Sequence, residues 1–161
     1  YKGVRLTDSG IKVALEILRH HRLLELYLHQ ALGYSWDKVH DEAEHLEHHI
    51  SEEFEDRIDS LLGNPQYDPH GAPIPSRDGF IPAISHDSLA HAEPAFEYII
   101  QRVDDERPEF LRYIGDVGLF PNVRFHLVAK EPFKGPLTLI IDNTTKIIGY
   151  ESAEKLFILR P

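Results

Sequence analysis

A run of prolines and glycines in the middle of the chain sets the strongest limit on its architecture. Between residues 64 and 79 lie Pro65, Pro69, Gly71, Pro73, Pro75 and Gly79. Proline cannot continue a helix or pair within a central strand, so no regular element crosses this stretch. Irregular sequence with Pro82 and Pro94 continues beyond it. We therefore expect two folded parts joined by a loop and a linker.

The residues before this break carry helical periodicity. Apolar residues recur at intervals of three and four from Ile11 onward, after Thr7-Asp8-Ser9, which offer capping oxygens. This pattern predicts a helix over about 9–31, stopped by Gly33. A second helix is predicted over about 35–50 with Ser35 as its cap, and a third over 51–63 between Ser51 and Gly63.

The residues after the break favour strands. We expect strands over 96–103, 123–128, 137–141, 146–150 and 156–159, with one short helix over 109–114. Asn143-Thr144-Thr145 is a hairpin signal between two of these strands. The fold class predicted is α+β: a helical domain over 1–79, a linker over 80–93 and a small β-barrel domain over 94–161.

Composition excludes several function classes. The formal net charge is −10, so this polypeptide by itself should be repelled by nucleic acid. There is no cysteine and therefore no disulfide or thiolate metal site. We find no run of about 18 apolar residues and no secretion signal, so we expect a cytoplasmic chain without a membrane partner. The chain contains no methionine and opens like the tail of a hairpin at Tyr1, from which we expect a fragment of a longer protein.

Histidines and glutamates at helical spacing form the candidate site. His40, Glu44 and His48 are successive i,i+4 neighbours with Glu47 beside them. On the preceding predicted helix, His21 and Glu25 form another such pair. If the two helices pack antiparallel, the two sets can meet, as metal ligands do in helical bundles.

A solvated helix face is the alternative for each of these residues taken singly. The joint pattern favours a site because Glu44, Glu47 and His48 border the predicted apolar face rather than oppose it, and such carboxylates need a cation or a partner. His20, His45 and His49 converge less well and are expected to be solvated. Carboxylates with imidazoles and no sulfur suit Mn²⁺ or Fe²⁺.

The same residues carry a family resemblance. Val39-His40-Asp41-Glu42-Ala43 with Glu47-His48, and His21-Arg22-Leu23 with Glu25 upstream, resemble the diphtheria-toxin-repressor family of iron- and manganese-dependent transcriptional regulators. Leu6-Thr7-Asp8-Ser9-Gly10 and Pro69-His70-Gly71 with Pro73-Ile74-Pro75 extend the similarity. Val117-Gly118-Leu119-Phe120-Pro121-Asn122 is similar to part of the family's SH3-like domain, and it is a less specific motif.

The resemblance implies a function and two metal sites. It implies a homodimeric repressor that binds operator DNA through a domain missing from this chain, with Mn²⁺ or Fe²⁺ as the corepressor. One site would use His21, Glu25 and His40, with Asp104 or Asp105 of the SH3-like domain as a further ligand. The other would use Glu44, Glu47 and His48, completed by the DNA-binding domain. Glu44, where iron-type members have cysteine, tilts the implied metal toward Mn²⁺.

Two other functions stay open at this point. A metal-dependent enzyme could use the same helix pair, because an open metal site also activates water. A dimerising module whose SH3-like part grips a proline-rich peptide is a third possibility. For dimerisation we expect the apolar faces of the second and third helices to be exposed, and the candidate residues are Trp36, Val39, Phe54, Ile58 and Leu61.

Overall fold

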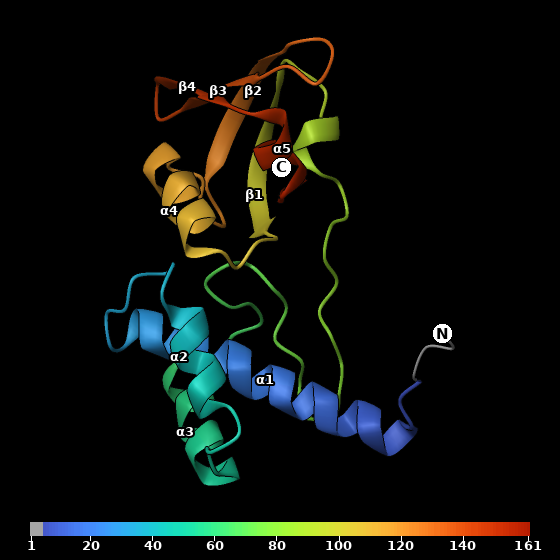
Figure 1. Ribbon diagram of the computed structural model, residues 1–161, viewed down its shortest axis with the longest axis vertical. Helices are drawn as coiled ribbons and strands as arrows, with labels where there is room; N and C mark the ends of the chain where they lie inside the picture. The colour runs from blue at the N-terminus through green and yellow to red at the C-terminus, as the bar shows by residue number, and fades with distance from the viewer. Residues whose placement is uncertain (1–4) are drawn as a thin grey trace. The chain divides into compact units, whose positions relative to one another are not determined.

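The computed structural model describes residues 5–161 and divides into two compact units (Figure 1). The first, helical unit comprises the chain up to residue 69 together with 73–83. The second, sheet unit comprises 70–72 and 84–161. The hairpin tail expected at residues 1–4 lies outside the described residues. No helix in the described part of the chain has both the length and the apolar character that a membrane span requires.

Three helices build the first unit: α1 (Asp8–Gln30), α2 (Val39–Leu46) and α3 (Glu52–Leu61). The predicted caps are confirmed at α1, where Thr7 accepts a hydrogen bond from the Gly10 amide, and at α3, where Ser51 accepts one from the Phe54 amide. Both α2 and α3 pack against α1. The buried residues of this core are Leu23, Leu24, Leu26, Leu28, Val39, Ala43, Ile58 and Ile74.

The second helix is shorter than the sequence predicts. Ser35 does not cap it, because α2 begins only at Val39, and residues 36–38 form a turn. Trp36 and Asp37 are both buried. Adjacent residues of a helix point about 100° apart, and the turn lets both side chains face inward. Burial therefore overrides the local capping signal.

The second unit is built on a five-stranded antiparallel sheet. Its strands are β1 (Phe96–Val103), β2 (Arg124–Lys130), β3 (Leu137–Ile141), β4 (Thr144–Ile148) and β5 (Leu156–Leu159), in the order β4-β3-β2-β1-β5. The helices α4 (Pro108–Val117) and α5 (Tyr150–Glu154) and a 3₁₀ turn over Leu89–His91 accompany it. Alternate residues of β2, Phe125 and Leu127, are buried, as expected for a strand with one face on a core. The α+β class is confirmed.

The hairpin between β3 and β4 is shifted from its predicted position. The two turn residues are Asp142 and Asn143, both with positive φ, and Thr144 already belongs to β4. A two-residue hairpin turn of this kind needs positive φ at both positions, which Asp and Asn tolerate and a β-branched threonine does not. Tyr150, predicted as a strand residue, begins α5 instead.

Candidate metal centre

Three side chains of the helical unit bring one donor atom each to a common point. His21 and Glu25 lie one turn apart on α1, and His40 lies in the first turn of α2. The His21 Nε2 atom is 3.0 Å from Glu25 Oε1 and 3.0 Å from His40 Nδ1, and His40 Nδ1 is 3.1 Å from Glu25 Oε1. The packing of α1 against α2 thus closes the triangle that the sequence spacing suggests.

The size of this triangle fits a small divalent cation. Donor atoms about 2.1 Å from one octahedral ion lie roughly 3.0 Å apart at adjacent positions. The Glu25 side chain is almost fully buried, and those of His21 and His40 are partly buried. Two imidazoles with a carboxylate suit Mn²⁺, Fe²⁺ or Zn²⁺, and the geometry leaves further coordination positions for other ligands.

Glu47 fixes the orientation of His21 from outside the triangle. Its Oε2 atom lies 2.7 Å from His21 Nδ1. A carboxylate accepts, so Nδ1 carries the proton of the neutral ring and Nε2 presents its lone pair to the cluster. This arrangement is the usual outer support of a metal-binding histidine. Glu47 is placed in this position because it is the C-cap residue of α2.

The surroundings of His21 attract positive charge. Burial has the largest single effect and lowers the pKa of His21, but hydrogen bonds to Glu25 and Glu47 and the charge of Glu25 together outweigh it. The pKa of His21 is therefore held above its ordinary value of 6.5. A proton or a metal ion is stabilised here.

Asp68 is a further acidic residue at this centre that sequence reasoning missed. It is buried, and a carboxylate oxygen of Asp68 lies within 4.8 Å of one of Glu25. The Arg22 Nε atom lies 3.9 Å from Asp68, and the Arg22 guanidinium also donates to the Pro73 carbonyl. Two buried carboxylates at this separation favour a cation between or beside them. Because Asp68 lies in the proline- and glycine-rich loop, no helical spacing could have indicated it.

The remaining predicted ligands of the helical unit are not drawn into the triangle. Glu44 is exposed on α2. Glu47 uses its second oxygen, Oε1, to contact His48 Nε2 at 3.1 Å, and the His48 side chain is mostly exposed. The structure thus joins Glu47 to both His21 and His48, while Glu44 stands apart.

Asp104 and Asp105 belong to the sheet unit and have partners within it. Asp104 Oδ1 accepts a hydrogen bond from Arg102 Nη1 at 2.6 Å. Asp105 accepts from the Arg107 amide at 3.0 Å and from the Arg107 guanidinium at 2.6 Å. These hydrogen bonds from Arg107 hold the pKa of Asp105 below its ordinary value. Asp105 therefore stabilises the turn that leads into α4, and its role as a ligand stays a prediction.

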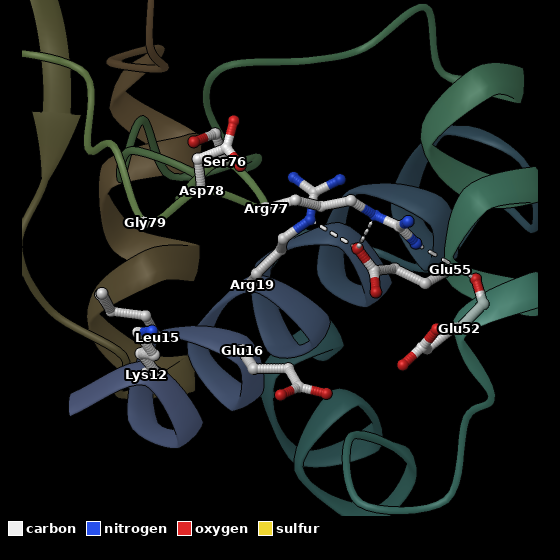
Figure 2. A pocket seen from close by; sticks show the side chains of 10 residues that line it. All are labelled: Lys12, Leu15, Glu16, Arg19, Glu52, Glu55, Ser76, Arg77, Asp78 and Gly79. Atoms are coloured by element: carbon white, nitrogen blue, oxygen red, sulfur yellow. Dashed lines mark hydrogen bonds and ion pairs between the residues drawn. The ribbon is translucent and has the colours of Figure 1, made fainter. Parts of the chain in front are cut away.

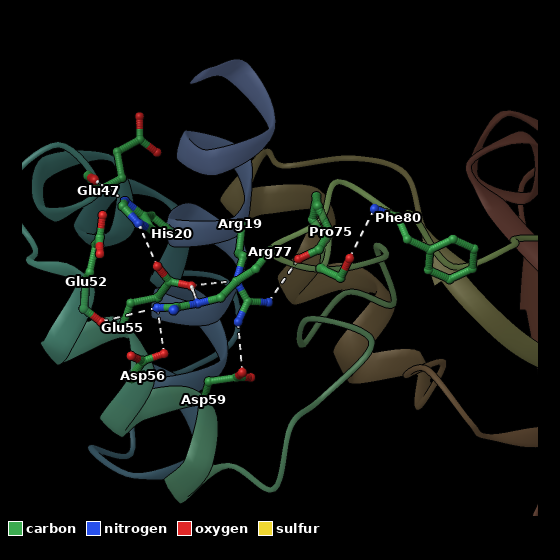
Figure 3. Close-up of polar contacts among 11 residues, drawn as sticks. Arg19, His20, Glu47, Glu52, Glu55, Asp56, Asp59, Pro75, Arg77 and Phe80 are labelled. Carbon is green, nitrogen blue, oxygen red and sulfur yellow. Dashed lines mark hydrogen bonds and ion pairs between the residues drawn. The ribbon is translucent and has the colours of Figure 1, made fainter. Parts of the chain in front are cut away.

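The expectation that His20 is solvated is wrong. Only 6% of His20 is exposed, and it belongs to a buried polar network (Figure 3). Its Nε2 atom lies 3.1 Å from Glu55 Oε2, and Glu55 Oε1 accepts from Arg19 Nε at 2.5 Å. Arg19 also donates to Asp59 Oδ2 at 2.8 Å and to the Pro75 carbonyl at 2.9 Å. Partners on α3 and in the loop bury a stretch of α1 that the sequence pattern of α1 alone marks as polar.

The predicted dimer face also needs correction. Trp36, Val39 and Ile58 are buried within the single chain, so they offer little surface to a second copy. Phe54 and Leu61 on α3 are 42% and 68% exposed. The apolar side chains of each helix pack mainly into the chain's own core, and only those at the edge of the apolar face reach the surface.

A pocket of about 590 Å³ opens beside this network. It is lined by Lys12, Leu15, Glu16, Arg19, Glu52, Glu55, Ser76, Arg77, Asp78 and Gly79. Figure 2 shows the guanidinium groups of Arg19 and Arg77 turned toward the Glu55 carboxylate. Cationic and anionic side chains are mixed along its wall, so the lining does not select an anion or a cation.

Two family descriptions match the chain. Residues 7–76 match the iron dependent repressor, metal binding and dimerisation domain, and residues 88–160 match the FeoA domain. The first covers the whole metal centre and all three helices of the helical unit. The second covers the sheet.

Solved and curated relatives agree with these matches. A solved manganese-dependent transcriptional repressor in complex with manganese is 41% identical, with a TM-score of 0.91 over 97% of this chain and 75% of that one. The iron-dependent repressor IdeR of Mycobacterium tuberculosis is 42% identical over 74 residues, which are 46% of this chain and 32% of that protein. A probable metal transport system membrane protein of Chlamydia trachomatis is 40% identical over 72 residues, 45% of this chain and 16% of that protein.

The chain spans at most about a third of the length of these two curated relatives. Of these three relatives, the solved structure is named as a transcriptional repressor and IdeR as an iron-dependent repressor, and none of the three is named as an enzyme. The alternative of a metal-dependent enzyme with a helix-pair site is therefore not supported.

Proposed function

Since the chain belongs to the diphtheria-toxin-repressor family of metal-dependent transcriptional regulators, we propose that it is the metal-sensing and dimerising part of a manganese- or iron-responsive repressor. The observation that carries this proposal is the triangle of His21 Nε2, Glu25 Oε1 and His40 Nδ1, with sides of 3.0 to 3.1 Å. Residues 1–79 are proposed as the metal-binding and dimerisation domain, 80–93 as a linker and 94–161 as the SH3-like, FeoA-like domain.

Sensing works through the arrangement of α1 and α2. A bound Mn²⁺ or Fe²⁺ supplies positive charge at the point where three donors converge. His21 and Glu25 come from α1 and His40 from α2, so only the packed arrangement of the two helices offers all three at once. An ion that binds the packed arrangement more tightly than other arrangements raises the population of the packed arrangement. Glu44, Glu47 and His48 are proposed as a second ligand set that needs further donors from the whole repressor.

Operator DNA is the proposed partner of the whole repressor. With a formal net charge of −10, these 161 residues are repelled by a duplex, so the contact with DNA has to come from another part of the protein. Because a repressor acts where its operator DNA lies, we propose that this repressor acts in the cytoplasm.

We propose a homodimer that uses the exposed margin of α3. Phe54 and Leu61 offer apolar area there without disturbing the core. Replacing Leu61 by aspartate should shift the chain toward monomer in sedimentation experiments at tens of micromolar. A wild-type chain that is monomeric at that concentration would contradict the proposal.

The metal site is tested by anaerobic titration with Mn²⁺ and Fe²⁺. The wild-type chain is compared with His40→Ala, which removes a corner of the triangle, and with Glu44→Ala, which changes an exposed member of the second ligand set, a set that lacks its further donors in this chain. We expect binding to be lost in the first variant and retained in the second. Equal affinity in His40→Ala and the wild type would refute this assignment.

A further inference from the structure

His20 links the metal centre to a charged network on α3. Its Nδ1 atom lies 3.1 Å from the backbone carbonyl of Glu47, and its Nε2 atom lies 3.1 Å from Glu55 Oε2. A carbonyl only accepts, so Nδ1 donates to Glu47. Both ring nitrogens are thus used, one toward the end of α2 and one toward α3 (Figure 3).

The hydrogen bond from His20 to Glu47 gives a partner to a backbone carbonyl group at the end of α2. Carbonyl groups in the last turn of a helix lack an intrahelical partner. α2 ends at Leu46, and the chain then turns over residues 47–49, so the helix itself does not hold this carbonyl. The carboxylate of the same residue lies 2.7 Å from His21 Nδ1. Fixing the Glu47 backbone therefore fixes the position from which Glu47 reaches the metal-binding histidine.

The other end of the link is firmly anchored. Glu55 is 4% exposed and meets Arg19 at 2.5 Å, and Arg77 lies 3.7 Å away (Figure 2). Arg19 is in turn held by Asp59 and by the Pro75 carbonyl. Glu55, the group that His20 contacts on α3, thus has partners of its own on α1 and in the loop, which limits its movement.

We infer that His20, held by Glu55, is a positioning residue for the metal centre. It fixes the backbone of Glu47, so that the Glu47 carboxylate meets His21 Nδ1 and His21 Nε2 points toward Glu25 and His40, where a metal ion would bind. This inference rests on the proposed metal-sensing function. It adds a residue that touches neither the ion nor any of the three ligating atoms.

Two substitutions of His20 separate its two contacts. In His20→Asn the amide nitrogen replaces Nδ1 and can still donate to the Glu47 carbonyl, whereas in His20→Gln it replaces Nε2 and reaches only toward Glu55. His29→Gln is the matched control, since His29 lies on the same helix, is exposed and contacts the Tyr34 carbonyl at 2.9 Å. Binding of Mn²⁺ is measured by calorimetry, and its coordination by electron paramagnetic resonance.

We expect His20→Gln to weaken Mn²⁺ binding about ten-fold, the lower end of the range for outer partners of metal ligands, and to alter the Mn²⁺ spectrum. His20→Asn should stay within about two-fold of the wild type, because it keeps the bond that positions Glu47. His29→Gln should bind as the wild type does. Unchanged affinity and spectrum in His20→Gln, or equal losses in both His20 variants, would overturn the inference.

A second background distinguishes positioning from general damage to the fold. In a Glu47→Ala chain the carboxylate is gone, so adding His20→Gln should cause no further loss of Mn²⁺ affinity. A loss that adds fully to that of Glu47→Ala would overturn the inference. Failure of the wild-type chain to bind Mn²⁺ would overturn the proposed function and this inference together, whereas wild-type binding with an unaffected His20→Gln overturns this inference alone.

Discussion

Replacing Arg19 by methionine removes a cation from an enclosed ion-pair network and leaves its partners in place. The Arg19 guanidinium is buried and donates to Glu55, Asp59 and the Pro75 carbonyl within 2.9 Å. Methionine reproduces the arginine side chain as far as the Nε position and keeps the packing of the apolar stem, so most of the cost comes from the abandoned acceptors. Breaking a buried pair by removing one partner costs about 3–5 kcal/mol of unfolding free energy. We expect a loss in this range.

The assay is urea unfolding followed by tryptophan fluorescence. Trp36 is the single tryptophan of the chain and lies buried in the helical unit, so its emission reports on that unit. With a urea dependence of about 2 kcal/mol per molar, the midpoint should fall by roughly 2 M.

The matched control is Arg57→Met. Arg57 pairs with Glu53 on the exposed face of α3, where such a pair contributes about 0.5 kcal/mol or less. If Arg19→Met shifted the midpoint no more than Arg57→Met does, the argument that the buried network stabilises this unit would be refuted.

Three further predictions concern the metal, acid and the loop. Mn²⁺ at about 100 times its dissociation constant should raise the unfolding free energy by about 2.7 kcal/mol, and His40→Ala or a chelator should abolish the gain in urea unfolding. Because Arg107 holds the pKa of Asp105 below 3.8, this pair stabilises the sheet unit above that pH, and the contribution is lost as pH falls through the lowered pKa. In melts followed by circular dichroism, Asp105→Asn should therefore unfold at a lower temperature than the wild type at neutral pH. The two melting temperatures should coincide in strong acid. Gly71→Ala should destabilise the sheet unit by about 3 kcal/mol or more, since its Cβ would lie 1.9 Å from a backbone oxygen at a φ of +85°. Gly63→Ala, with positive φ and open space, should cost only about 1 kcal/mol in the same melting experiment.

Local spacing in the sequence was sufficient to predict much of the metal centre. His21 and Glu25 share a helix face because four residues make about one turn, and that relation needs no tertiary information. The position of His40 relative to them depends on how α2 packs on α1. The periodic pattern indicates that the two helices pack together. Only the folded structure shows that His21 Nε2 and His40 Nδ1 lie 3.0 Å apart.

Other features had no local signal. Asp68 lies in an irregular loop and reaches the centre only through the folded path of that loop. His20 looks like a surface residue in the sequence of α1, and it is buried because α3 brings Glu55 to cover it. The predicted dimer residues failed for the same reason, since periodicity gives a helix its apolar face but does not say whether a neighbouring element or a second chain covers it.

The sequence by itself determined the two-part architecture, the helical positions of the ligand pairs and the absence of sulfur ligands, because proline, side-chain period and composition act locally. Only the tertiary structure decided which of those side chains meet, which charged residues are buried and where Glu47 lies relative to His21. These depend on contacts between elements far apart in the chain, which neither propensity nor spacing encodes.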